Sequence, residues 1–201
     1  MTKHFNCAKI IFCEFAISSL SVRRRINQNY ERTIQYAKQK VLFITQGAVI
    51  AAIYVVLTYI VSLLGLTNGV IQVRLSEALT ILPVFTPAAI PGLVVGCVIS
   101  NILTGAVIWD VIFGSLATLI GAVGTYLLRK HHRILYPLPP IIANTVIVPL
   151  VLTYAYGVPD ALWFSALTVC AGEVISCGVL GLLLYHGLDN KYCRRLFTAK
   201  V

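Results

Sequence analysis

The amino-acid sequence predicts an all-α membrane protein, a bundle of six transmembrane helices with a short second helix and both termini in the cytoplasm. Three observations lead to this prediction: the composition, the recurrence of long apolar runs, and the placement of the basic residues. Of the 201 residues, 58% are hydrophobic and 11% are charged, whereas an ordinary soluble domain is roughly 25% charged. The composition therefore excludes an ordinary soluble protein.

Several apolar runs are long enough to cross a bilayer, which takes ~20 helical residues. They lie at Val41–Leu66, Ala88–Val107, Val111–Leu128, Leu138–Tyr156 and Leu162–His186. The chain is therefore expected to be a multi-pass α-helical membrane protein.

The basic residues gather in three segments. Of the sixteen Lys and Arg, all but Arg74 lie before Val41, within Arg129–Arg133 or after Tyr185. Short basic segments beside membrane spans mark the cytoplasmic side. We therefore interpret the positive charge as a solvated cytoplasmic face, and we expect no nucleic-acid partner.

A sixth helix is predicted from the number of membrane crossings that must separate the basic segments. If all three basic segments are cytoplasmic, an even number of crossings must separate neighbouring segments, yet only three obvious spans lie between Lys40 and Arg129. The remaining crossing is expected at Leu75–Pro87, where about a dozen α-helical residues would reach only ~18 Å. Such a short helix is tolerated at membrane depth only where protein or a water-filled cavity surrounds it.

Three regions follow from this topology. Residues 1–40 are expected to be a basic cytoplasmic extension, either a tail that is disordered or attached to the membrane surface, or an upstream addition from a mis-assigned start codon. Residues 41–187 are expected to form the six-helix membrane domain, and residues 188–201 a basic cytoplasmic tail.

Motifs for energy transduction and catalysis are missing from the sequence. It contains no G-x-x-x-x-G-K-[ST], no H-E-x-x-H and no G-x-S-x-G. Its six cysteines show neither C-x-x-C nor a Cys/His spacing suited to zinc. We expect no catalytic residue, no metal site and no cofactor bound by this chain.

The ionisable residues of the apolar body need a reason, because a charge at the bilayer centre costs ~3 kcal/mol or more. Glu173 lies ~16 Å along the last predicted span, and it faces either a cavity, which we favour, or a close helix contact. Asp110 is either a helix N-cap or a residue at the rim of a pocket, and Ser76 with Glu77 resembles a helix start. Arg74 can pair with Glu77, three residues on.

Other polar and aromatic residues also have two interpretations. Asn101 and Asn144 either bond a neighbouring helix or present an amide to a ligand. Trp109 is either an interfacial anchor or a surface on which a planar ligand stacks. A membrane subunit that binds a small solute fits these patterns best.

Four stretches carry a resemblance to a known family: "VRLSEALTILPVFTPAAIPGLVVGCVISNILTG", "WDVIFGSLATLIGA", "LPPIIANTVIVP" and "GEVISCGVLG". Over about Thr45 to Leu184 the chain resembles the QueT family of queuosine-precursor transporters, which are substrate-binding S components of energy-coupling factor (ECF) transporters. The resemblance implies a six-helix S-component bundle whose cavity opens outward. It also implies two kinds of partner, the EcfT membrane subunit and two ABC-type ATPases that hydrolyse the ATP.

The first predicted span is similar to that of S components that share one energising module. Within "TQGAVIAAIYVVLT", Ala48 and Ala52 match the alanine motif that packs on EcfT in such proteins. The resemblance therefore implies that these two alanines are partner-coupling residues.

The ligand implied by the resemblance is a 7-deazaguanine such as preQ1, or queuine. Carboxylates suit its N–H edge and its ammonium group, amides complete the base edge, and aromatic rings suit its face. The predicted substrate-binding residues are Glu173, Glu77, Asp110, Asn101, Asn144, Trp109, Arg74 and Phe85. The alternatives are an S component for another vitamin-like nutrient, a stand-alone secondary transporter and, last, an intramembrane enzyme.

Overall fold

The computed structural model describes residues 3–65, 74–155, 157, 162–190 and 197, with side chains from residue 27 onward. The chain divides into two compact units, residues 1–42 with 200–201 and residues 43–199. Most of the predicted C-terminal tail, 191–196 and 198–201, lies outside the described residues. Each unit is described by itself below.

The first unit is helical. The helix α1 spans Lys3–Leu63, so the described part of the predicted N-terminal extension belongs to a helix. The sequence explains this locally, because it contains neither Gly nor Pro before Gly47, and these are the two residues that break helices most strongly.

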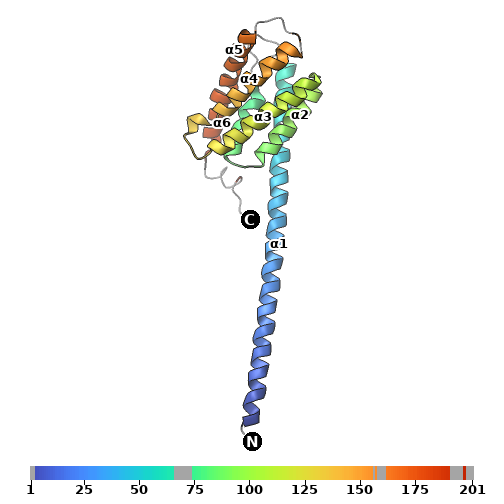
Figure 1. Ribbon diagram of the computed structural model, residues 1–201, viewed down its shortest axis with the longest axis vertical. Helices are drawn as coiled ribbons and strands as arrows, with labels where there is room; N and C mark the ends of the chain where they lie inside the picture. The colour runs from blue at the N-terminus through green and yellow to red at the C-terminus, as the bar shows by residue number, and fades with distance from the viewer. Residues whose placement is uncertain (1–2, 66–73, 156, 158–161, 191–196, 198–201) are drawn as a thin grey trace. The chain divides into compact units, whose positions relative to one another are not determined.

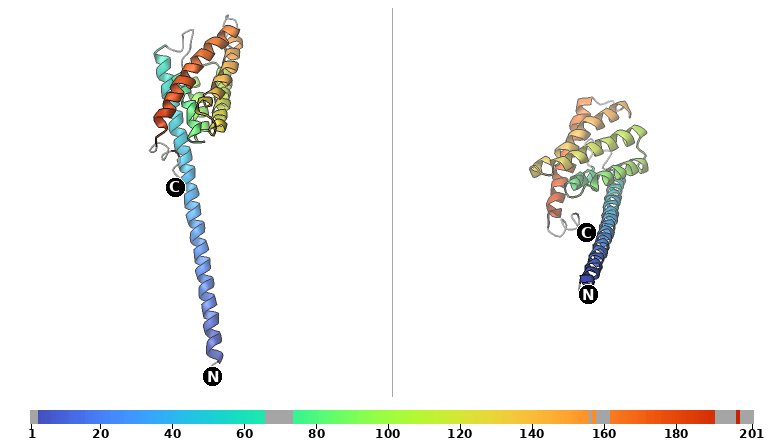
Figure 2. Two further views of the ribbon diagram at one scale, coloured as in Figure 1. Left: turned by 90° about the vertical axis from the view of Figure 1, so that its left-hand side faces the viewer. Right: turned by 60° about the horizontal axis from the view of Figure 1, so that its bottom comes forward.

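The second unit contains the rest of α1 and a set of packed helical segments (Figure 1). In chain order these are η1 (Leu75–Val84), α2 (Ala89–Leu103), α3 (Ile108–Leu128), η2 (Arg133–Leu135), α4 (Leu138–Tyr154), α5 (Leu162–Glu173), η3 (Val174–Leu180) and α6 (Gly181–Leu188). The last three follow one another without a break and form a single rod (Figure 2). No strand occurs in the part of the chain that the structure describes.

Among the residues that the structure describes, four helical stretches are long and apolar enough to cross a membrane: Asn27–Leu63, Ile108–Leu128, Arg133–Tyr154 and Leu162–Leu188. The run predicted at Ala88–Val107 is shorter than expected, because α2 has 15 residues and ends at Leu103. A Schellman motif ends it: Gly105 has φ +74°, and the Ala106 N–H donates to the Asn101 carbonyl oxygen at 2.9 Å.

The predicted short helix at Leu75–Pro87 is present as η1, a 3₁₀ helix. Eight of its ten residues are buried, and it packs against α2, α3, α6 and η3. A 3₁₀ helix rises ~2.0 Å per residue, so η1 is ~20 Å long. Neighbouring protein therefore surrounds the backbone of this helix, as a short helix at membrane depth requires.

The start of η1 corrects one detail of the sequence analysis. Arg74, in an extended conformation, is the N-cap residue, and Ser76 lies in the first turn instead of capping it. The Arg74 N–H donates to Ser176 Oγ of η3 at 3.1 Å. A tertiary contact thus replaces the local cap that the sequence predicts.

Glycines allow two helix pairs to approach closely. A Cβ at Gly92 of α2 would lie 2.6 Å from the carbonyl oxygen of Gly47 on α1. On α3, a Cβ at Gly121 or Gly124 would lie 2.8 Å or 2.4 Å from Pro140 or Pro139 of α4. Small residues thus bring the backbones together, as in other membrane helix pairs.

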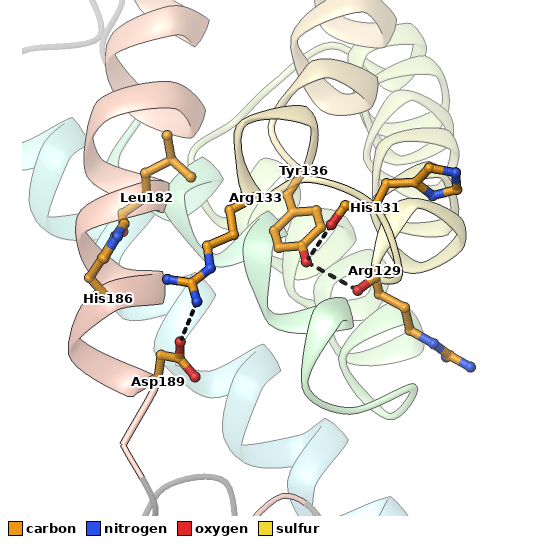
Figure 3. A network of polar contacts seen from close by, with 7 residues as sticks. All are labelled: Arg129, His131, Arg133, Tyr136, Leu182, His186 and Asp189. Carbon is orange, nitrogen blue, oxygen red and sulfur yellow. Dashed lines mark hydrogen bonds and ion pairs between the residues drawn. The ribbon is translucent and has the colours of Figure 1, made fainter.

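A polar network closes the end of the bundle at the α3–α4 connection, here called the Tyr136 end (Figure 3). The Tyr136 hydroxyl donates to the carbonyl oxygens of Arg129 at 3.1 Å and His131 at 3.2 Å. Arg133 Nη2 lies 3.8 Å from Asp189 Oδ2, just after α6. These contacts tie the connection between α3 and α4 to the C-terminal end of α6.

We predict that Gly92→Ala lowers the stability of the protein by ~1–3 kcal/mol, because the new methyl group meets backbone that cannot move aside. The measurement is thermal unfolding of the purified protein in detergent. The matched control is Gly187→Ala on α6, where a Cβ meets nothing within 4 Å. Equal melting temperatures for the two variants would contradict the close contact of α1 with α2.

Candidate functional site

Two glutamates from distant parts of the chain meet in the interior of the bundle. Glu77 lies in the first turn of η1 and Glu173 is the last residue of α5; their side chains are 1% and 5% exposed. A carboxylate oxygen of each and the Cys177 sulfur all lie within 4.8 Å of one another. Glu77 and Glu173 are called the acid pair below.

Each carboxyl group accepts a hydrogen bond from a buried side chain. The Tyr54 hydroxyl of α1 donates to Glu77 Oε1 at 2.8 Å, and the Cys177 thiol of η3 donates to Glu173 Oε2 at 3.2 Å. Glu77 Oε2 is buried without a hydrogen-bond partner. A buried acceptor left unpaired costs about 1–3 kcal/mol, so this oxygen is a candidate acceptor for a ligand.

The backbone widens into a π-helix immediately after Glu173. This segment, η3, contains Ser176 and Cys177, which are both fully buried. Ser176 Oγ accepts the hydrogen bond from Arg74, and Cys177 Sγ lies 3.4 Å from the Glu77 carbonyl oxygen. π-helical turns are rare and occur frequently at functional sites. The irregular turn brings the Glu173 region against the start of η1.

A polar cavity of about 280 Å³ lies beside the acid pair, close to the lower end of the range for small-molecule pockets. It is called the Arg74 cavity. Residues from α1, η1, α2 and the start of α3 line it: Tyr54, Thr58, Val61, Ser62, Arg74, Leu75, Ser76, Asn101, Thr104, Gly105, Ala106 and Asp110. The N-terminal end of η1 and the C-terminal end of α2 thus form part of its wall.

The charges around this cavity are unequal. The positive charge of Arg74 interacts most strongly with Asp110, next with Glu77 and more weakly with Glu173. The Arg74 cation therefore lies near three carboxyl groups. The field favours a ligand that is cationic or rich in hydrogen-bond donors.

The two asparagines have different surroundings. Asn101 of α2 bridges helices, because its Nδ2 lies 3.5 Å from the Asp110 carbonyl oxygen. Asn144 of α4 is 2% exposed, and its amide acts as a donor toward the carboxyl groups of both Glu77 and Glu173. Asn144 therefore belongs to the polar cluster around the acid pair.

Asp110 lies at the cavity but does not cap α3. Val107 is the N-cap residue, and Asp110 follows in the first turn. Its carboxylate still complements the positive N-terminal end of the helix dipole. The N-cap interpretation of Asp110 is therefore wrong, because the cap lies three residues earlier, at Val107. Asp110 instead lies at the rim of the Arg74 cavity.

The structure does not bring the two predicted stacking residues to the acid pair. Trp109 is 53% exposed and lines a separate apolar groove of about 460 Å³ between α3 and α4. Phe85 lies at the Tyr136 end, where its ring centroid is 5.3 Å from that of Tyr185. The aromatic residue that lines the Arg74 cavity is Tyr54.

Glu77, Glu173 and Cys177 are also the described residues whose spacing could hold a metal ion. Two carboxylates and a thiolate would suit a transition metal. Here, however, the Cys177 thiol and the Tyr54 hydroxyl already donate hydrogen bonds to the acid pair. The arrangement described is therefore a hydrogen-bonded one.

The predicted partner-coupling residues lie on an exposed part of α1. Ala48 and Ala52 are both exposed, whereas Ala51 and Tyr54 face inward. Ala48 belongs to an apolar groove of about 280 Å³, lined by Phe43, Ile44, Gly47, Ala48, Ala51, Pro91, Gly92 and Val95. This groove offers small side chains to a neighbouring helix.

Tyr54, Ser176 and Cys177 were not predicted as site residues. A usable signal exists for Tyr54, because a tyrosine hydroxyl within an apolar span requires a partner from another helix. Cys177 follows Glu173 by four residues, which places both on one helix face. The closeness of Ser176 and Cys177 to η1 could not be predicted from the sequence, because it depends on the π-helix after Glu173.

These features define the class of protein: a multi-pass α-helical membrane protein with a buried polar cluster beside a cavity. A family model described as QueT transporter matches residues 44–190, and the chain belongs to the QueT transporter family.

A curated relative supports the same assignment. Over 83 residues the chain is 40% identical to the queuosine precursor transporter QueT of Lactococcus lactis subsp. cremoris (strain MG1363), an alignment that covers 41% of this chain and 48% of the relative. The chain thus spans about half the length of this relative. No solved structure matches the chain.

We predict that Arg74→Met destabilises the protein by ~1–3 kcal/mol, because three carboxyl groups lose the cation that interacts with them. Adding Asp110→Asn is expected to restore part of this loss, because it removes the carboxylate that interacts most strongly with Arg74. The measurement is thermal unfolding in detergent, with Arg133→Met, whose side chain is 56% exposed, as the control. A double variant no more stable than Arg74→Met would contradict the coupling.

Proposed function

We propose that this protein is the substrate-binding subunit of an ATP-driven ECF importer, and that it takes up a queuosine precursor, a 7-deazaguanine such as preQ1, or queuine. The observation that carries the proposal is the buried Glu77 Oε2, an acceptor without a close hydrogen bond, in one polar cluster with Glu173 and Asn144. Membership of the QueT transporter family and the printed name of the relative support it.

The chemistry of a 7-deazaguanine matches this polar cluster. Its ring N–H and exocyclic amine are donors for carboxylate oxygens, and its carbonyl is an acceptor for an amide N–H. The aminomethyl group of preQ1 is a cation, which suits the excess of carboxyl groups around Arg74. We assign the base edge to Glu77, Glu173 and Asn144, and the outer part of the ligand to the Arg74 cavity.

The proposed orientation has six crossings, both termini in the cytoplasm of a bacterial cell, and the Arg74 cavity facing outward. The placement of charge supports it. Arg129, Lys130 and Arg133 lie at the Tyr136 end, whereas the cavity lies where α2 ends and α3 begins. The basic end would be cytoplasmic by the positive-inside rule.

The proposed partners are the EcfT membrane subunit and two ABC-type ATPases, which hydrolyse the ATP. This chain has no P-loop of its own, and we expect it to bind no cofactor. The exposed Ala48 and Ala52 of α1 support a contact with a partner helix, because small residues let helix backbones approach closely. Toppling of the loaded subunit, driven by the ATPases, would carry the cavity to the cytoplasmic face.

We predict that Glu77→Gln and Glu173→Gln each weaken preQ1 binding by about tenfold or more, because each removes a charge-assisted hydrogen bond. The measurement is binding of preQ1 to the purified protein by calorimetry, with ligand-induced thermal stabilisation as a second readout. Asp189→Asn is the matched control, because Asp189 pairs with Arg133 at the Tyr136 end.

If both glutamine variants bind preQ1 as tightly as the parent, the assignment of the acid pair is wrong. A panel of preQ1, queuine, thiamine, folate and riboflavin separates the proposal from an S component for another nutrient. Stabilisation by a vitamin and not by a deazapurine would select that alternative.

We predict that Ala48→Leu together with Ala52→Leu abolishes preQ1 uptake in cells that carry the coupling module, while binding to the purified subunit stays unchanged. Larger side chains would hold the partner helix away from α1. Ala166→Leu on α5 is the control for added bulk. Uptake by this chain without the module would overturn the ECF mechanism and select a stand-alone transporter.

A further inference from the structure

We infer that Tyr54 is a positioning residue for ligand recognition. It holds Glu77 so that one carboxylate oxygen remains for the ligand. The hydrogen-bond donors along one edge of the ligand are therefore shared between Glu77 and Glu173. The inference rests on the proposed function, in which the acid pair binds the ligand. It goes further by naming a residue of α1 that sets the geometry of recognition.

The contact of Tyr54 with Glu77 is buried and well formed. Tyr54 is 2% exposed, Glu77 is 1% exposed, and their oxygens lie 2.8 Å apart. A hydroxyl that donates to a carboxylate in the protein interior makes a strong, charge-assisted bond. Glu77 Oε1 is therefore occupied, and the buried Oε2 is the oxygen left without a partner.

The Tyr54 side chain is held in place by packing. It belongs to the apolar core with Ile50 and Leu93, and a Cβ at Gly96 would lie 2.8 Å from Tyr54 Cβ. Displacement of the ring would require α1 and α2 to separate. The orientation of Glu77 is therefore fixed before any ligand arrives, which favours tight binding.

Tyr54 also lies between the cavity and the acid pair. It lines the Arg74 cavity, whereas Glu77 and Glu173 are not part of the cavity wall. Its hydroxyl points to Glu77. A ligand in the cavity thus meets Tyr54 before it reaches the acid pair.

The second carboxylate is held in the same manner. Cys177 donates to Glu173 Oε2, so each glutamate has one oxygen engaged by a neighbouring side chain. A carboxylate receives two adjacent donors side by side through both of its oxygens, and in each glutamate one of these oxygens already accepts a bond. With the acid pair within 4.8 Å, two adjacent donors of a ligand are better received by one oxygen from each glutamate.

The test compares Tyr54→Phe with the parent in calorimetric binding of preQ1. The variant removes the hydroxyl alone, and we expect about tenfold weaker binding. Introduced into Glu77→Gln, the same change is expected to alter the affinity by less than about twofold, because Tyr54 acts through Glu77. Tyr136→Phe, which removes a hydroxyl at the Tyr136 end, is expected to bind like the parent.

Binding by Tyr54→Phe as tight as the parent's would overturn the inference. An equal loss in the Glu77→Gln background would also overturn it, because Tyr54 would then act through packing. If the parent itself does not bind preQ1, the proposed function fails, and this inference fails with it. Failure confined to the Tyr54 variants leaves the proposed function standing.

A second measurement does not depend on the folding of Tyr54→Phe. It compares preQ1 with an analogue that lacks the exocyclic amine, on Glu77→Gln and Glu173→Gln. If the two glutamates share the donor edge of the ligand, one of the two variants binds preQ1 and the analogue with equal affinity. In that variant, the carboxylate oxygen that was replaced is the partner of the exocyclic amine. If Glu173→Gln leaves preQ1 binding unchanged, Glu77 alone receives the edge and the inference is wrong.

Discussion

The burial of Glu77 within η1 is the constraint on which the rest of the bundle depends. Lipid cannot satisfy either a carboxylate or the backbone of a short helix, so neighbouring protein has to do so. Tyr54 donates to the Glu77 carboxylate, Thr80 donates to its carbonyl oxygen at 2.6 Å, and the Cys177 sulfur lies 3.4 Å from the same carbonyl oxygen. Packing of α2, α3, α6 and η3 around η1 therefore serves stability and the candidate site at once, and it leaves one oxygen for a ligand.

The space for a ligand comes from helices that end early. η1 begins at Leu75, and the Schellman motif at Gly105 stops α2 at Leu103. The residues at these two ends line the Arg74 cavity. Elsewhere the helices approach closely, through Gly92 against Gly47 and through the α3 glycines against the α4 prolines. Tight packing in one region and shortened helices in another thus leave room for the polar Arg74 cavity.

Helix α1 contributes to both candidate surfaces. Tyr54 faces the acid pair, while Ala52 and Ala48, two and six residues earlier, are exposed. Under the proposed function, a single rigid element would thus position the ligand on one face and contact the partner on the other. Gly96 and Gly92 of α2 support this stretch of α1 from within the bundle, so the same small residues constrain both surfaces.

The sequence by itself determined the all-helical membrane class, the short helix near Leu75–Pro87, the candidate acid pair and the family resemblance, because apolar length, charge placement and intramembrane carboxyl groups are local properties. Only the tertiary structure decided that Glu77 and Glu173 meet, that Asn144 joins them and that Phe85 and Trp109 lie elsewhere. Contacts between residues ~100 positions apart, such as Cys177 with Glu77, depend on how helices pack. The π-helix after Glu173 and the Tyr54 hydrogen bond arise from that packing, and hydropathy does not encode either.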